Sequence, residues 1–276
     1  MTKPSLAFIG AGNMAAALVH GLIKDGYPAE RIIASDPDGT KLQALRRYNH
    51  VQTADGNTDA CRSADVVVLA VKPQILRRVA EDLAPAILDR RPLVVSIAAG
   101  VRVATLQRWL GDDHTPVVRT MPNTPAMVQT GATALYASAG VSDAQRNHAE
   151  MLMRAVGLTL WLEDEAHMDA VTALSGSGPA YFFLVMDAMA EAAEQLGLTA
   201  ESAQLLTLQT ALGAARMAME SADSPATLRA RVTSPGGTTE QAIATFEAGG
   251  LRDLFRSALQ AARDRSVELS QVLDAD

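Results

Sequence analysis

The chain has 276 residues, which is enough for one or two domains with a sizeable core, and its formal net charge is −7. That acidic balance argues against a nucleic-acid-binding protein, whose footprint is a basic face. The lone cysteine, Cys61, excludes an internal disulfide and suits a reducing compartment, and no His/Cys cluster has metal-ligand spacing.

The first ten residues, MTKPSLAFIG, predict a strand that runs into a glycine turn. They lack the hydrophobic length of a signal peptide. No apolar run approaches the roughly 18 residues of a membrane span. We therefore expect a cytoplasmic protein that binds no membrane.

Residues 6–15 carry the first functional motif, a short apolar run followed by GAGNMA and a helical pattern. G-x-G-x-x-A between a strand and a helix is a form of the dinucleotide-binding fingerprint. Gly10 allows the tight turn, Gly12 lets the backbone approach a pyrophosphate, and Ala15 keeps the helix close to the sheet. The free N–H groups at the helix start favour the anion.

A second strand, residues 31–35, ends at Asp36, and this end decides which dinucleotide fits. An acidic residue here accepts hydrogen bonds from the adenosine ribose hydroxyls and so favours NAD. Ser35 could instead bond a 2′-phosphate, with Lys41 nearby, and Asp36 could also cap the next helix. The choice between NADH and NADPH stays open at this stage.

Apolar runs then recur at the spacing of alternating strands and helices, which predicts an α/β fold. They cover residues 66–71, 93–97, 117–118, 135–137 and 158–162. The segments after them are small, polar or proline-fixed, which suits a wall against a flat cofactor beyond the carboxyl ends of the strands. We expect a Rossmann-type dinucleotide-binding domain over residues 1–163.

Residues 164–276 predict an all-α domain, because the strand pattern stops there. Helical patterns cover residues 166–174, 179–197, 200–221, 225–232, 238–248 and 251–273. The first two turns of residues 179–197 and the stretch 205–219 are apolar nearly all round, and such helices must be buried. About 110 residues form too small a core for that surface, so we expect a homodimer or larger assembly.

The segment RVTSPGGTTEQAI, residues 231–243, interrupts these helices with proline, two glycines and several hydroxyls. Thr238 to Gln241 fits the T-x-x-Q capping box, so one interpretation is an ordinary helix start. Two glycines exceed what a cap requires, however. Bare N–H groups flanked by Ser234 and two threonines also form a carboxylate site, and we expect this segment to hold a small anionic substrate.

With that segment, the chain resembles the pyrroline-5-carboxylate reductase family. FIGAGNMA, AVKPQ, VVSIAAGV, RTMPNTPA and LSGSGPAYFF follow in the family's order, and the resemblance covers nearly the whole chain. It implies reduction of 1-pyrroline-5-carboxylate to L-proline by NADPH or NADH, the last step of proline biosynthesis. It also implies a helical domain that interleaves in a homodimer, an active site shared between protomers, and in some members a decamer of five dimers.

The resemblance assigns site residues by their position in these motifs. At the cofactor it implies Gly10, Gly12, Asn13 and Met14 for the pyrophosphate; Ser35, Asp36 and Asn57 for the adenosine ribose; Val71, Lys72 and Pro73 for the adenine side; and Ala98, Met121 and Asn123 for the nicotinamide. At the substrate it implies Ser234 and the backbone N–H groups of Gly237, Thr238 and Thr239. The Thr239 hydroxyl would lie near the ring nitrogen as the catalytic group. Asp36 replaces the serine or threonine that is common in members preferring NADPH.

Two other functions remain possible from the residues. A 3-hydroxyacid dehydrogenase of the same two-domain plan would need a Lys or His acid beside the reacting oxygen, and Lys72 is the only lysine at a strand end. A non-catalytic nucleotide sensor would keep the fold alone. The intact segment from Ser234 to Thr239 argues against the sensor.

Overall fold

The computed structural model describes residues 3–275, and the chain divides into two compact units. The first contains the chain up to Ser177 together with the segment from Ala262 onward, and the second covers Gly178–Ala261. None of the helices described is long and apolar enough to cross a membrane. The sequence predicts a domain boundary near residue 163, whereas the first compact unit extends to Ser177, because the segment after β8 packs on it. The division into a dinucleotide-binding and a substrate-binding domain at residue 163 stays a prediction.

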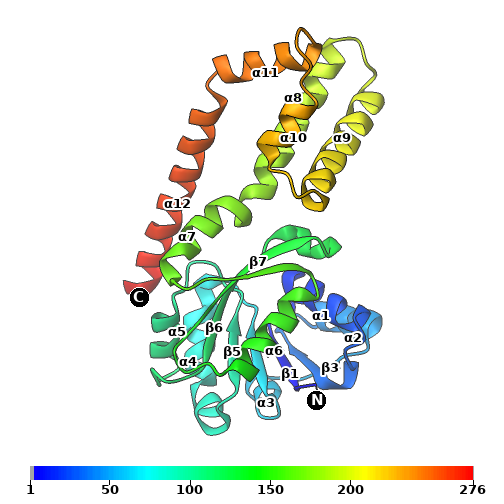
Figure 1. Ribbon diagram of the computed structural model, residues 1–276. Coiled ribbons are helices and arrows are strands. Elements are labelled where there is room, and N and C mark those ends of the chain that lie inside the picture. Colours follow the sequence, from blue (N-terminus) through cyan, green and yellow to red (C-terminus); the bar gives the residue numbers. More distant parts are fainter. Residues whose placement is uncertain (1–2, 276) are drawn as a thin grey trace. The chain divides into compact units, whose positions relative to one another are not determined.

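An eight-stranded sheet forms the centre of the first unit, with strand order β3-β2-β1-β4-β5-β6-β7-β8 (Figure 1). Neighbouring strands are parallel except β6 and β7. The strands are β1 Leu6–Ile9, β2 Ile32–Ser35, β3 Gln52–Thr53, β4 Val66–Leu69, β5 Leu93–Ser96, β6 Val117–Met121, β7 Gly131–Ala137 and β8 Gly157–Trp161. Every predicted strand is present; the two-residue β3 was not predicted.

Alternating side chains of β1 explain why helices cover both faces of this sheet. Leu6 and Phe8 belong to one buried cluster, and Ala7 and Ile9 belong to the other. The first cluster is closed by α1 Asn13–Lys24, α2 Gly39–Asn49 and α6 Asp143–Arg154. The second is closed by α3 Asn57–Cys61, α4 Pro73–Arg90 and α5 Val103–Trp109.

The first unit also contains α7, Met168–Val171, a π-helical turn at Thr172–Gly176, and the end of the C-terminal helix α12, Leu251–Ala275. The Ser266 hydroxyl of α12 donates to Asp169 Oδ1 at 2.7 Å. Near the end of the helix, Asp274 accepts a hydrogen bond from Thr105 and pairs with Arg102. These polar contacts fix the chain's last turns to α5 and α7.

The second unit is helical, as predicted. Its helices are α8 Gly178–Gln195, α9 Ala200–Glu220, α10 Pro225–Arg231, α11 Thr238–Ala248 and the first part of α12. Large apolar side chains on α8 and α9 stay exposed: Phe182 is 67% exposed, Phe183 64% and Leu212 61%. The apolar faces found in the sequence are therefore not buried within the single chain.

Candidate active site

The glycine turn after β1 has the geometry of a pyrophosphate site. Gly10 has φ +100, and a Cβ there would lie 2.6 Å from the Ala70 carbonyl oxygen, so only glycine fits. The Gly10 N–H donates to Ser35 O at 2.8 Å. A Cβ on Gly12 would meet no atom within 4 Å, which leaves the N-terminus of α1 open to an anion.

Asp36 lies at the end of β2 and is fixed to the glycine turn. Its carboxylate accepts hydrogen bonds from the N–H groups of Ala11, at 2.7 Å, and Asp38, at 2.9 Å. The side chain is 8% exposed, and Lys41 Nζ lies 3.7 Å away. Asp36 does not cap the next helix: Asp38 is the N-cap of α2 and accepts from the Thr40 N–H. The hydrogen bond from the Thr40 hydroxyl lowers the pKa of Asp38.

The other predicted cofactor residues follow strand ends or begin helices at the carboxyl edge of the same sheet. Lys72 is the N-cap of α4 and Pro73 its first residue, while Asn57 is the first residue of α3. Ala98 follows β5 and is buried, and Met121 ends β6. The topology thus brings the segments after β1, β2, β4, β5 and β6 to one edge, where open α/β sheets bind ligands.

In the second unit, residues 234–237 form a tight turn before α11. The Gly237 N–H donates to Ser234 O at 3.0 Å, and Gly236 has φ +72. Proline followed by a residue with positive φ is the pattern of a type II turn. A Cβ on Gly237 would lie 2.9 Å from Ser234 O, so steric exclusion explains the second glycine and the positive φ explains the first.

The predicted capping box is wrong. Gly237, not Thr238, is the N-cap of α11, and no side chain caps it. Glu240 instead reaches back, and its Oε2 accepts the Gly236 N–H at 2.7 Å. Gly237 has an extended backbone and is the last residue before the helix. Thr238 is therefore the first helical residue, and its side chain is not in the N-cap position.

The start of α11 therefore offers fewer free amides than the sequence predicts. The Gly237 N–H closes the turn, whereas those of Thr238 and Thr239 lie at the N-terminus of a helix. Within the described residues, neither threonine hydroxyl forms a hydrogen bond with the protein. Thr239 is half-buried and Ser234 exposed. Free donors and a helix dipole are the features that favour an anion at a helix N-terminus.

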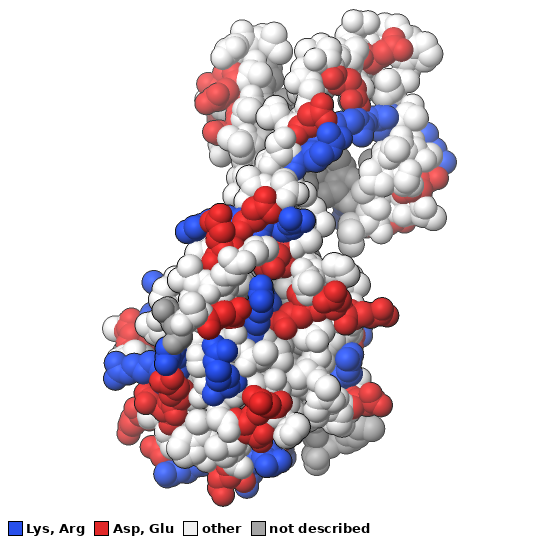
Figure 2. All heavy atoms as spheres, turned by 90° about the vertical axis from the view of Figure 1, so that its left-hand side faces the viewer, with Lys and Arg blue, Asp and Glu red and all other residues white. Residues whose placement is uncertain are grey.

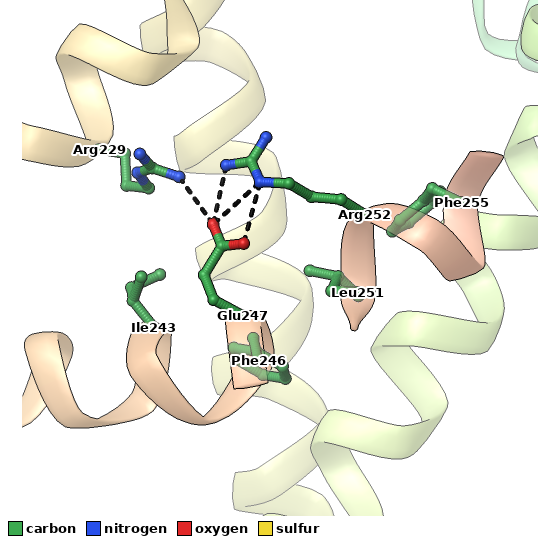
Figure 3. A pocket seen from close by; sticks show the side chains of 7 residues that line it. All are labelled: Arg229, Ile243, Phe246, Glu247, Leu251, Arg252 and Phe255. Carbon is green, nitrogen blue, oxygen red and sulfur yellow. Dashed lines mark hydrogen bonds and ion pairs between the residues drawn. The ribbon is translucent and has the colours of Figure 1, made fainter. Parts of the chain in front are cut away.

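A separate hollow of about 430 Å³ lies at the opposite end of α11 (Figure 3). Its apolar lining comes from Ile243, Phe246, Leu251 and Phe255. Glu247 accepts two hydrogen bonds from Arg252 Nε, at 2.9 and 3.1 Å, and one from Arg229 at 3.4 Å. The hydrogen bonds from Arg252 hold the pKa of the Glu247 carboxyl below its ordinary value. Apolar lining without free anion donors does not suit a small carboxylic acid.

The charged side chains bear on two other kinds of site, a basic binding face and a metal centre. On the face drawn in Figure 2, Lys and Arg are interspersed with Asp and Glu. Among residues 3–275, no group of three His, Cys, Asp or Glu side chains could hold a metal ion. The two candidate binding elements are the glycine turn after β1 and the start of α11.

Comparisons with known proteins identify the family of the chain. The family model for NADP oxidoreductase, coenzyme F420-dependent, matches residues 5–100, and that for pyrroline-5-carboxylate reductase dimerisation matches residues 165–269. A pyrroline-5-carboxylate reductase of Pseudomonas aeruginosa is 55% identical over 273 residues, covering 99% of both chains. The chain belongs to the pyrroline-5-carboxylate reductase family.

Solved structures support that assignment. A pyrroline-5-carboxylate reductase from Coxiella burnetii is 50% identical with a TM-score of 0.94, covering 97% of this chain and 99% of that one. A Plasmodium falciparum pyrroline carboxylate reductase with NADP bound is 27% identical with a TM-score of 0.85, covering 98% and 99%. The predicted family and the fold class, a Rossmann-type domain followed by a helical one, are confirmed.

The sequence missed three features of the site. These are the anchoring of Asp36 by the Ala11 N–H, the bond from Gly236 to Glu240, and the contact of Asn123 with the π-helical turn. The first joins residues 25 positions apart and the third residues 52 apart, so no local pattern reports them. The second had a local signal, because the acid is four residues after Gly236.

Proposed function

We propose that the protein reduces 1-pyrroline-5-carboxylate to L-proline with NADH or NADPH, the final step of proline biosynthesis. The observation that carries this is the free N-terminus of α11, placed after a type II turn, in a chain 55% identical to a pyrroline-5-carboxylate reductase. When bound, the dinucleotide supplies a hydride to the ring imine carbon. The substrate reacts as the protonated imine, so the C=N π electron pair moves onto a nitrogen that already carries a proton, and this nitrogen becomes the secondary amine of proline.

The substrate carboxylate is proposed to bind the N–H groups of Thr238 and Thr239 and the Ser234 hydroxyl. The Gly237 N–H could bind the carboxylate only by breaking its hydrogen bond to Ser234 O. The main role of Gly237 is therefore steric, because a Cβ there would collide with Ser234 O in the turn. The Thr239 hydroxyl has no protein partner among the described residues and is assigned to the ring nitrogen. Holding two reactants in place can contribute roughly 7–11 kcal/mol to lowering a reaction barrier.

The cofactor is proposed to lie across the carboxyl edge of the sheet, with its pyrophosphate at the start of α1. The open space at Gly12 fits that group. The proposed contacts, grouped by strand end, are Gly10, Gly12, Asn13 and Met14; Ser35, Asp36 and Asn57; Val71, Lys72 and Pro73; and Ala98, Met121 and Asn123.

We further propose that NADH is the preferred cofactor. The Asp36 carboxylate is buried at the ribose end and held by two backbone N–H groups, so it cannot swing away to admit a 2′-phosphate. Like charges at close range oppose binding. Asp36→Ser should lower the KM for NADPH about tenfold relative to NADH, or about 1.4 kcal/mol. An unchanged ratio of the two KM values would contradict this assignment.

Steady-state kinetics on the full-length protein test the reaction. NADH and NADPH oxidation would be followed with the five-membered imino acid, and the reverse reaction with 3-hydroxy acids. We expect the imino acid to cause oxidation of the reduced dinucleotide. We expect no reduction of the oxidised dinucleotide by 3-hydroxy acids. Turnover of a hydroxy acid would favour the dehydrogenase, and cofactor binding without turnover of either class would favour the nucleotide sensor.

The proposed assembly is a homodimer formed through the helical unit, with the active site shared between protomers. The match to a dimerisation family and the exposed apolar faces of α8 and α9 support it. Assembly of dimers into a decamer and a cytoplasmic location are further parts of the proposal.

A further inference from the structure

The helical segment that begins with α7 is widened by a π-helical turn over Thr172–Gly176. The Ser177 N–H donates to the Thr172 carbonyl, five residues back, at 2.8 Å. The Ser175 carbonyl loses its normal helical partner, because the residue four positions later is Pro179, which has no N–H. Such turns are frequent at functional sites.

Asn123 supplies the missing donor. Its Nδ2 donates to Ser175 O at 3.0 Å, and its Oδ1 accepts the Ala132 N–H at 2.9 Å. The residue is 9% exposed. One side-chain amide therefore joins the segment after β6, the start of β7 and the π-helical turn, with both of its polar ends engaged.

The same turn also packs on the end of β6. A Cβ on Gly176 would lie 2.5 Å from Met121 Cε, so the absence of a side chain at Gly176 leaves the space that Met121 occupies. β6 lies beside β5 in the sheet, and the Thr120 hydroxyl donates to Ser96 O at 3.0 Å. The π-helical turn thus borders the strand ends where a Rossmann-type sheet places the reactive ring of its cofactor.

We propose that Asn123 is a positioning residue for hydride transfer, which acts by locking the π-helical turn and Met121 beside the nicotinamide. The inference rests on the proposed function for the identity of the reaction. It gives the Asn123 side chain an indirect role, because both of its hydrogen-bonding groups serve the protein, so the cofactor contact proposed for this residue falls to its backbone. Loss of the Ser175 bond should leave the adenosine end of the cofactor site intact and loosen only the reactive end.

Asn123→Asp and Asn123→Ala in the full-length enzyme test this. Aspartate keeps the acceptor for Ala132 but cannot donate to Ser175. We expect kcat to fall about 10- to 100-fold, since a misplacement near 1 Å costs about that much. The dissociation constant for the reduced dinucleotide should change less than about threefold, because the substitution leaves the adenosine end of the site intact and distant sites are nearly independent. The kinetic isotope effect with 4-deuterated cofactor should rise.

Thr130→Ala is the matched control, because it removes a side-chain bond to Pro125 O in the same loop without touching the turn. Pro179→Ala in the Asn123→Ala background restores an N–H for Ser175. It should recover thermal stability but not kcat if positioning, rather than folding, is lost. The inference would be overturned if kcat and the isotope effect were unchanged in the Asn123 variants. It would also be overturned if Pro179→Ala restored kcat and the isotope effect together with thermal stability. An inactive wild type would instead count against the proposed function.

Discussion

Among single residues, Thr239 is the one to which a catalytic role is proposed. Its hydroxyl has no protein partner among the described residues, and its backbone N–H lies in the first turn of α11. Thr239→Val keeps the shape and the N–H but removes the hydroxyl. We expect kcat to fall about 100-fold, the lower range for a positioned proton-transfer group, and its pH dependence to change.

The matched control for Thr239 is Thr245→Val in the same helix. The Thr245 hydroxyl is already bonded to Gln241 O at 2.9 Å, so it is not available to a ligand. This variant should keep the wild-type kcat and pH profile, measured by steady-state kinetics. If Thr239→Val and Thr245→Val had equal kcat values at every pH, the Thr239 hydroxyl would have no role in the reaction.

Cys61 illustrates a residue whose burial decides its chemistry. It is the last residue of α3 and belongs to a buried cluster, and desolvation raises the pKa of its thiol to about 12. Thiolate is the reactive form, so almost none is present at pH 8. A disulfide exchange reagent should not modify the native protein but should modify one thiol per chain in denaturant. Rapid native modification would contradict the packed position.

Residue-level prediction from the sequence succeeded where the requirement is local. The tight turn at Gly10 is confirmed by its positive φ, because one motif of six residues defines that turn, whereas the approach of a pyrophosphate to Gly12 stays a prediction. The engagement of Asn123 could not be predicted in this way. Its partner Ser175 is 52 positions away, and the need for a donor arises from Pro179 in a different element.

Among the elements, the start of α11 separates two ways of beginning a helix. A T-x-x-Q box would make Gln241 the stabilising side chain, whereas the structure uses Glu240 bonded to the Gly236 N–H. Glu240→Ala should therefore destabilise the protein by about 1 kcal/mol, as expected for one hydrogen bond, while Gln241→Ala should have little effect. Urea denaturation measures both, and the reverse order would restore the capping box.

Strand positions were predictable because buried parallel strands are continuous apolar runs. The direction of each strand relative to its neighbour was not predictable. β7 runs antiparallel to β6, and its first four residues, from Gly131, carry too little apolar pattern to be recognised as strand. The π-helical turn was read as ordinary helix, since widening by one residue leaves the helical period nearly unchanged.

For the whole molecule, the exposed apolar faces of α8 and α9 predict association. Phe183 and Leu212 are more than 60% exposed, which a stable monomer rarely shows over a continuous surface. Leu212→Glu should convert the assembly to monomers and abolish activity, measured by sedimentation and kinetics. Tyr48→Glu, on α2 and 72% exposed, is the control and should change neither. A monomeric, active wild type would contradict the proposed assembly.

Mixed dimers can show whether the two sites of one chain work together or across protomers. Gly12→Asp places a carboxylate where the pyrophosphate binds but leaves the start of α11 intact; Thr239→Val does the reverse. If sites are shared, a mixed dimer contains one complete site, formed by the Thr239 of one chain and the glycine turn of the other. Equal mixing after dissociation should then recover roughly a quarter of wild-type activity, as random pairing in a two-fold dimer gives. Sites formed within single chains would recover none, because every site would carry one of the two substitutions.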